Sequence, residues 1–165
     1  MTKNPQKILH GRYHVVPRTL ILIFKDDRVL LQKGSQTKKL WAGLYNGLGG
    51  HIERGEDVLS SARRELLEEA GLTCADLRIC GMVMIDVNED EGILMFVLSG
   101  MNPAGEIRAS DEGVPEWIPI SKVKQLPVVD DIPSMIERVK RHQGNIPFSG
   151  HYTYGPDGKR IEVFN

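Results

Sequence analysis

Runs of apolar residues bounded by polar turns predict β-strands along most of the chain. The runs at 19–24 (TLILIF) and 29–32 (VLLQ) flank the charged stretch 25–28, which predicts a hairpin. After this hairpin, the segment 37–48 is expected to be a loop that leads into a short strand over 47–52. Further strands are expected at 77–87, 93–99, 116–119, 148–154 and 160–164, with turns at the acidic stretch 88–92 and at Gly-Pro-Asp-Gly 155–158.

Two stretches carry apolar residues at helical spacing instead. From Asp57 to Ala70 there is no Pro or Gly, and Ala, Leu, Arg and Glu dominate, so we expect a helix that Gly71 ends in a left-handed conformation. A second helix is expected over 133–142. The residues expected to face the core are Leu59, Ala62, Leu66 and Ala70 in the first helix and Ile132, Met135, Ile136 and Val139 in the second. Mixed strands with two helices indicate an α/β sandwich.

Composition narrows the class of protein further. At 165 residues the chain is expected to form one domain over 1–165. The 21 basic and 22 acidic residues nearly balance, which argues against partners that are nucleic acid polymers or membranes. No apolar run has the length of a signal peptide or a membrane span, so we expect a cytoplasmic protein, as either a monomer or a homodimer. Cys74 and Cys80 are expected to be reduced thiols.

Three glutamates of the first helix indicate a metal site. Glu65, Glu68 and Glu69 fall within an arc of about 100° on a helical wheel. Like charges at such spacings cost a helix a few tenths of a kcal/mol per pair, which a bound cation would offset. Clustered carboxylates suit Mg²⁺, with Mn²⁺ possible, and the metal can bridge phosphate oxygens. The alternative is a solvated acidic face with ordinary ion pairs.

The residues around these glutamates fit the same chemistry. Arg64 points to a different side of the helix and can pair with Glu56, which would fix the preceding loop against the helix. The glycines at 47, 49 and 50 allow close approach of the backbone to phosphate or metal, and the Gly50 carbonyl is a candidate metal ligand.

The segment 50–72 (GHIERGEDVLSSARRELLEEAGL) also resembles a known motif over its whole length. Gly50, Glu56, the run 64–66, Glu68-Glu69 and Gly71-Leu72 match every specified position of the Nudix box, without gaps. The chain is therefore identified as a member of the Nudix hydrolases. The resemblance implies the Nudix fold, a mixed β-sheet between α-helices. It also implies metal-dependent hydrolysis of a diphosphate, with Arg64 and the three glutamates in the catalytic machinery.

The resemblance implies one more acidic residue, from a loop beyond the box. Many Nudix enzymes take a ligand or general base from that region, and the segment 109–119 resembles the family's acidic stretch before a Trp-x-Pro strand. Glu112 is the first candidate, with Asp111 and Glu106 behind it. Trp117 is expected to pack in the core, and His51 is assigned no role.

Weaker similarities bear on the substrate. The segment 41–50 resembles MutT-type enzymes, which hydrolyse purine nucleoside triphosphates including oxidised ones. In mammalian members of that group an Asn at the position of Asn46 binds the base, and a pair corresponding to Asp130 and Asp131 reads the purine. The alternatives are a turn residue for Asn46, a helix N-cap for Asp130 and a first-turn carboxylate for Asp131. The chain departs from those enzymes at Val128, where they carry a Trp that stacks on the base.

The expected reaction is therefore cleavage of an oxidised purine triphosphate to monophosphate and pyrophosphate, which clears damaged nucleotides from the precursor pool. Two alternatives stay open. The box also fits hydrolysis of ADP-ribose, dinucleoside polyphosphates, other nucleotide conjugates or an isoprenoid diphosphate. Some Nudix-like domains are instead non-catalytic nucleotide sensors, although these usually lack the box carboxylates that this chain retains.

Overall fold

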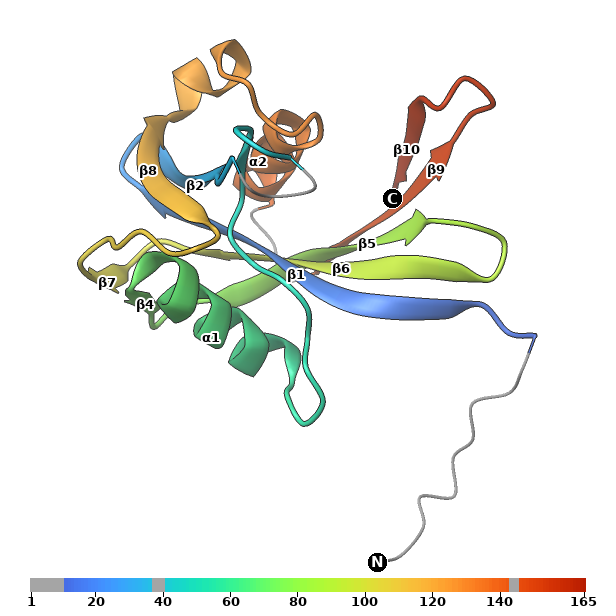
Figure 1. The fold of residues 1–165 in the computed structure, drawn as a ribbon, viewed down its shortest axis with the longest axis horizontal. Helices are drawn as coiled ribbons and strands as arrows, with labels where there is room; N and C mark the ends of the chain where they lie inside the picture. The colour runs from blue at the N-terminus through green and yellow to red at the C-terminus, as the bar shows by residue number, and fades with distance from the viewer. Residues whose placement is uncertain (1–10, 37–40, 143–145) are drawn as a thin grey trace, which may run out of the picture.

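The computed structural model describes residues 11–36, 41–142 and 146–165. A long, twisted sheet runs through the molecule, with one helix on each side of it (Figure 1). The elements in chain order are β1 (His14–Lys25), β2 (Arg28–Gly34), β3 (Tyr45–Asn46), α1 (Val58–Ala70), β4 (Leu72–Cys74), β5 (Arg78–Asp86), β6 (Glu91–Gly100), β7 (Pro103–Gly105), β8 (Gly113–Pro119), the 3₁₀ helix η1 (Ile120–Gln125), α2 (Ile132–Arg141), β9 (Phe148–Tyr154) and β10 (Arg160–Phe164).

The main sheet has eight strands and mixed direction. Its order is β10-β9-β5-β6-β1-β2-β3, and β8 also pairs with β2. The pairs β1–β6 and β5–β9 are parallel, whereas the other pairs of this sheet are antiparallel. Strands β4 and β7 form a separate antiparallel pair. This architecture confirms the expected α/β fold with a mixed sheet between helices.

The apolar run of β1 supplies both faces of the sheet, because successive strand side chains point to opposite sides. Leu20, Leu22 and Phe24 are buried on the face covered by α2. Ile21 and Ile23 are buried on the face covered by α1. A strand covered on both sides reads as a continuous apolar run rather than an alternating one. The run at 19–24 therefore lies at the centre of the molecule.

Both helices bury the faces that the sequence predicts. Ala62, Leu66 and Ala70 of α1 are fully buried, and Leu59 is partly buried beside them. The four apolar residues of α2 that were expected to face the core are Ile132, Met135, Ile136 and Val139, and all of them are buried.

Local hydrogen bonds explain where α1 begins and ends. The Asp57 side chain accepts from the backbone N–H groups of Leu59 and Ser60, at 2.8 and 3.1 Å. Asp57 is thus the N-cap, and the helix begins one residue later than expected. Gly71 has φ of 71°, and its N–H donates to the Leu67 carbonyl at 2.9 Å. This left-handed C-cap confirms the predicted end of the helix.

Most expected strands are present with small shifts at their ends, although β1 begins at His14 rather than at residue 19. The strand expected over 47–52 is wrong. In this part of the chain, only β3 pairs as a strand. Beyond β3, the segment makes only single bridges, from Leu48 to Ile21 and from His51 to Arg18. Gly49 interrupts the ladder: its φ is 122°, and its N–H donates to the Glu69 side chain. Strands β4 and β7 and the helix η1 were not expected. Residues 37–40 of the expected loop lie outside the described residues.

Two other expectations can be compared with the structure. Cys74 and Cys80 are free cysteines, as expected, and both are buried. Trp117 is partly buried and packs against the core beneath α1, also as expected. In the described ranges, no helix combines the length and the apolar composition needed to cross a membrane.

Candidate active site

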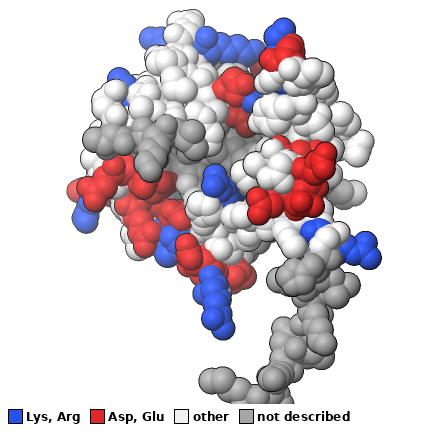
Figure 2. All heavy atoms as spheres, turned by 45° about the vertical axis from the view of Figure 1, so that its right-hand side comes forward, with Lys and Arg blue, Asp and Glu red and all other residues white. Residues whose placement is uncertain are grey.

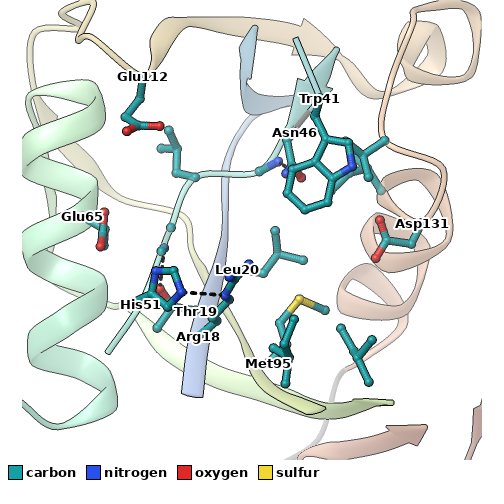
Figure 3. A pocket seen from close by; sticks show the side chains of 18 of the residues that line it. Arg18, Thr19, Leu20, Trp41, Asn46, His51, Glu65, Met95, Glu112 and Asp131 are labelled. Atoms are coloured by element: carbon teal, nitrogen blue, oxygen red, sulfur yellow. Dashed lines mark hydrogen bonds between the residues drawn. The ribbon is translucent and has the colours of Figure 1, made fainter. Parts of the chain in front are cut away.

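A cavity of about 1120 Å³ lies between α1 and α2, with β1 beneath it (Figure 3). Its size leaves room for a nucleotide, because it slightly exceeds the range of about 300–1,000 Å³ that is usual for small-molecule sites. Figure 2 shows acidic side chains gathered on both sides of a hollow, with basic atoms between them. The charged residues that line the cavity are the acids Glu53, Glu65, Glu68, Glu69, Asp111, Glu112, Asp130 and Asp131 and the bases Arg18, Arg64, Lys159 and Arg160.

Two glycines bring the backbone close to the carboxylates on the α1 side of the cavity. Glu69 is only 6% exposed, and its Oε2 accepts from the Gly49 N–H at 2.8 Å. A Cβ at Gly49 would lie 2.4 Å from the Thr19 carbonyl oxygen of β1. A Cβ at Gly50 would lie 2.6 Å from Glu65 Oε1. Only glycine at both positions lets the backbone lie this close to both β1 and the two carboxylates.

Arg64 joins the loop before α1 to the glutamates of the helix, which confirms the expected pairing with Glu56. Its Nε and Nη2 donate to the two oxygens of Glu56 at 2.6 and 3.0 Å. Its Nη1 donates to Glu65 and Glu68 at 2.9 and 3.1 Å. The hydrogen bonds from Arg64 lower the pKa of Glu56 to about 2. Arg64 is therefore a positioning group for Glu65 and Glu68.

The carboxylates on this side offer the chemistry of a divalent metal site. Glu65, Glu68 and Glu69 all line the cavity and supply hard oxygen donors. Gly50 leaves room at Glu65 that any side chain would fill, and its carbonyl accepts from the Thr19 N–H at 2.8 Å, using one of two lone pairs. Among the described residues, no three metal-binding side chains converge on a single point. The assignment of Glu65, Glu68, Glu69 and the Gly50 carbonyl as metal ligands therefore stays a prediction. The oxygen donors present on this side of the cavity agree with it.

The three candidates for a further acid fall in different places. Glu112 and Asp111 line the cavity, and Figure 3 shows Glu112 on the same side as Glu65. The Glu112 N–H is held by the Ser110 hydroxyl at 3.3 Å. Glu106 does not line the cavity, and its carbonyl lies beside Gly71. The geometry thus favours Glu112 and Asp111 over Glu106.

Asn46 lies on β3 at the upper part of the cavity in Figure 3. Its Oδ1 accepts from the Gly47 N–H at 2.8 Å, so it does serve the local turn. No described residue accepts a hydrogen bond from its Nδ2. The turn contact therefore fixes the side chain and leaves an amide donor for a ligand.

Asp130 and Asp131 both line the cavity, and Figure 3 shows Asp131 on the α2 side, across from Glu65. The N-cap alternative for Asp130 is wrong: Asp131 occupies that position, and its side chain makes no capping hydrogen bond. Asp130 instead pairs with Arg160 of β10, which satisfies its charge. Burial raises the pKa of Asp131. A carboxyl group that resists ionisation is suited to donate a hydrogen bond as well as accept one.

Several residues that line the cavity were missed by sequence reasoning. Arg18 of β1 donates through Nε to His51 Nε2 at 3.1 Å, and no described carboxylate pairs with it. Trp41 also lines the cavity, beside Asn46 in Figure 3. The Tyr152 hydroxyl is buried and has no partner among the described residues. Arg18 carried one signal, a charge directly before an apolar strand. The others are brought to the site by tertiary structure alone.

Comparisons with known proteins agree with the fold and the motif. Residues 14–139 match the NUDIX domain. An oxidized purine nucleoside triphosphate hydrolase of Danio rerio is 38% identical over 138 residues, which is 81% of this chain and 86% of the relative. The hydrolase of the same name from Mus musculus is 29% identical over 141 residues, 82% of this chain and 85% of the relative.

Solved structures share the architecture at lower identity. A MutT protein from Bacillus halodurans superimposes with a TM-score of 0.74 at 22% identity, covering 92% of this chain and 98% of that one. The NUDIX domain of Shewanella oneidensis NrtR, solved with ADP ribose, gives a TM-score of 0.70 at 16% identity and covers 87% and 95%. At these identities the likeness extends to the fold alone.

Proposed function

The chain belongs to the Nudix family of hydrolases, and we propose that its substrate is an oxidised purine nucleoside triphosphate. The products would be the nucleoside monophosphate and pyrophosphate. Such a reaction removes damaged precursors before they enter DNA, which would place the protein with the nucleotide pool in the cytoplasm.

The observation that carries this proposal is the division of one cavity into two ends. The end at α1 holds the box glutamates, and the end at α2 holds Asn46, Asp130 and Asp131, whose donors and acceptors suit the edge of a purine. A nucleoside triphosphate has the same division between phosphates and base. The names of the zebrafish and mouse relatives support the same substrate class.

Nudix hydrolases use divalent metal ions, and for this chain we propose Mg²⁺, with Mn²⁺ as a substitute. Eight acidic and four basic side chains line the cavity in the described residues, so a polyphosphate would be repelled without added positive charge. Glu65, Glu68 and Glu69, with the Gly50 carbonyl, would hold the ion. Bound there, it supplies charge against the phosphate oxygens and lowers the pKa of a nearby water.

The chain's own residues would then position the reactants. Arg64 holds Glu65 and Glu68 in place, and Arg18 lies between the two ends with its cation available to a phosphate. Glu69 and Glu112 are the two candidates for removing the proton from the attacking water. If Glu112 is the base, Glu112→Gln lowers kcat and flattens the acidic limb of its pH profile. If Glu69 is the base, that limb persists in the Glu112 variant.

The test is turnover of a nucleotide panel with Mg²⁺, with products identified by chromatography. The panel holds the ordinary dNTPs, 8-oxo-dGTP, 2-hydroxy-dATP, ADP-ribose and a dinucleoside polyphosphate. Preferred release of pyrophosphate from an oxidised purine triphosphate would support the proposal. Preference for ADP-ribose or another conjugate would retain the hydrolytic end and overturn the substrate. Binding without turnover would instead support a nucleotide sensor.

A further inference from the structure

Few aromatic side chains are available for stacking against a base in this cavity. Val128 is partly buried, packs against the core beneath α2 and does not line the cavity. Of the described residues that do, Trp41, Tyr152 and Tyr154 carry large aromatic rings. Tyr152 is only 1% exposed, and the Arg160 guanidinium lies 4.9 Å from its ring centroid, so its ring is already covered.

Trp41 has the placement that Tyr152 lacks. It is 47% exposed, which is unusual for so large an apolar side chain. Figure 3 shows the indole beside Asn46, on the same side of the cavity as Asp131. Tyr154, at the end of β9, is also exposed, but it lies in the strand beyond Tyr152, away from Asn46 in the sheet order.

The backbone at Trp41 is held in a conformation that a bulky residue rarely adopts. Its φ is 60°, in the left-handed region that favours glycine. The turn that imposes this φ is tied to the sheet, because the Trp41 carbonyl accepts from the Leu44 N–H at 3.0 Å and the Gly34 carbonyl from the Gly43 N–H at 3.1 Å. Strain of this kind gathers at ligand-binding positions, where the surrounding structure enforces it.

We propose that the Trp41 indole is the surface on which the substrate's nucleobase stacks. The inference rests on the proposed function in requiring a nucleotide substrate, but not on which base it carries. Stacking on an aromatic ring is tolerant of base identity, because every base has a π face. In this arrangement Trp41 supplies affinity, whereas Asn46, Asp130 and Asp131 supply discrimination between bases.

The test uses the fluorescence of Trp41, which is one of only two tryptophans in the chain. In Trp117→Phe, Trp41 is the remaining tryptophan, and titration with 8-oxo-dGMP should quench its fluorescence. Trp41→Ala should weaken 8-oxo-dGMP binding about 5- to 150-fold, and Trp41→Phe should retain most of the affinity. Inorganic tripolyphosphate has no base, so with Mg²⁺ it should bind wild type and Trp41→Ala equally.

Trp41→Gly separates this role from a structural one. Glycine relieves the backbone strain, so this variant should be at least as stable as wild type while binding 8-oxo-dGMP as weakly as Trp41→Ala. Unchanged affinity for 8-oxo-dGMP in Trp41→Ala, or equal weakening of tripolyphosphate, would overturn the proposal. If the enzyme turns over a different nucleotide, the proposed substrate fails but stacking is tested in the same way with that nucleotide's monophosphate.

Discussion

Backbone atoms at two glycines determine where the acidic side chains of the site lie. Gly49 offers its N–H to Glu69, and the missing Cβ of Gly50 makes room for Glu65. Glu69 is thereby tied to the backbone beside β1, and Glu65 is held next to Gly50 by its hydrogen bond from Arg64. Preorganised carboxylates of this kind are what metal-assisted phosphate chemistry requires.

Removing one charge from this pair should abolish most of the activity. We expect Glu65→Gln and Glu69→Gln each to lower kcat at least about a hundredfold, because glutamine is a poor ligand for a hard divalent ion. The fold should persist, since the amide oxygen introduced by Glu69→Gln can still accept from the Gly49 N–H. Steady-state kinetics and circular dichroism measure both effects. Glu89→Gln, in the exposed turn between β5 and β6, is the matched control and should behave as wild type.

Asp131, which is proposed to bind the base, carries a cost in stability. Burial raises its pKa in the folded protein, so folding favours the protonated form. Its stabilising contribution is present below the unfolded-state pKa and is lost as the pH rises through the folded-state pKa. Asp131→Asn should therefore be more stable than wild type at pH 7, with the difference shrinking towards pH 3. Urea unfolding at several pH values measures this.

The same substitution should impair substrate binding. Loss of a hydrogen bond to the base is expected to lower kcat/KM for the preferred nucleotide about 5- to 150-fold. Asp90→Asn, in an exposed turn remote from the cavity, supplies the control for a change of charge alone. A variant that loses stability at pH 7 while keeping full activity would contradict both expectations.

At the scale of elements, α1 links the core to the chemistry. One face carries Ala62 and Leu66 into the core, and the adjoining face carries the glutamates into the cavity. The position of the helix is fixed at its two ends, by the Asp57 side chain and by the left-handed Gly71. Any slippage of α1 would move its carboxylates relative to Gly49, so the caps also protect the geometry of the site.

Gly71→Ala should destabilise the protein by about 1–3 kcal/mol, because alanine in the left-handed region is strained. A Cβ there would also lie 2.8 Å from the Glu106 carbonyl oxygen. Gly55→Ala is the comparison: Gly55 also has positive φ, 92°, but its Cβ would meet nothing within 4 Å. Thermal unfolding should rank Gly71→Ala below Gly55→Ala; the reverse order would show that the contact is relieved by local movement.

How far the sequence predicts each element depends on whether its pattern is local. The Gly71 C-cap and buried face of α1 and most strands of the sheet follow from spacing and turn residues alone, and these were predicted. The strand expected over 47–52 failed because the Gly49 N–H bonds a side chain twenty positions away in sequence. The same limit applies elsewhere in the cavity: Arg18, Trp41 and Tyr152 lie far apart in the chain, and only the tertiary fold brings them to the same cavity.

At the scale of the whole molecule, the fold is built independently of the site. Two apolar cores lie on opposite faces of the sheet, and each is closed by its own helix. The box glutamates lie at the edge of one core rather than within it. Stability should therefore come from the cores, with the metal contributing to activity.

Chelation should reveal this separation. EDTA is expected to abolish turnover while leaving the circular dichroism spectrum and the unfolding midpoint nearly unchanged, and added Mg²⁺ or Mn²⁺ should restore activity. Mg²⁺ together with the product monophosphate at about 100 times its Kd should then raise the midpoint by about 5–10 °C. Unfolding on chelation alone would contradict the prediction by making the metal part of the fold.

The proposed placement of phosphate and base contacts at opposite ends of one cavity also bears on how this enzyme can diversify. The proposed phosphate end depends on α1 and on Gly49 and Gly50, where an added Cβ would meet Thr19 or Glu65. The proposed base end draws on β3, the turn at Trp41 and the start of α2, which are separate from α1 and from the two glycines. A lineage, or a laboratory selection, can therefore change substrate preference there while inheriting the hydrolytic step intact.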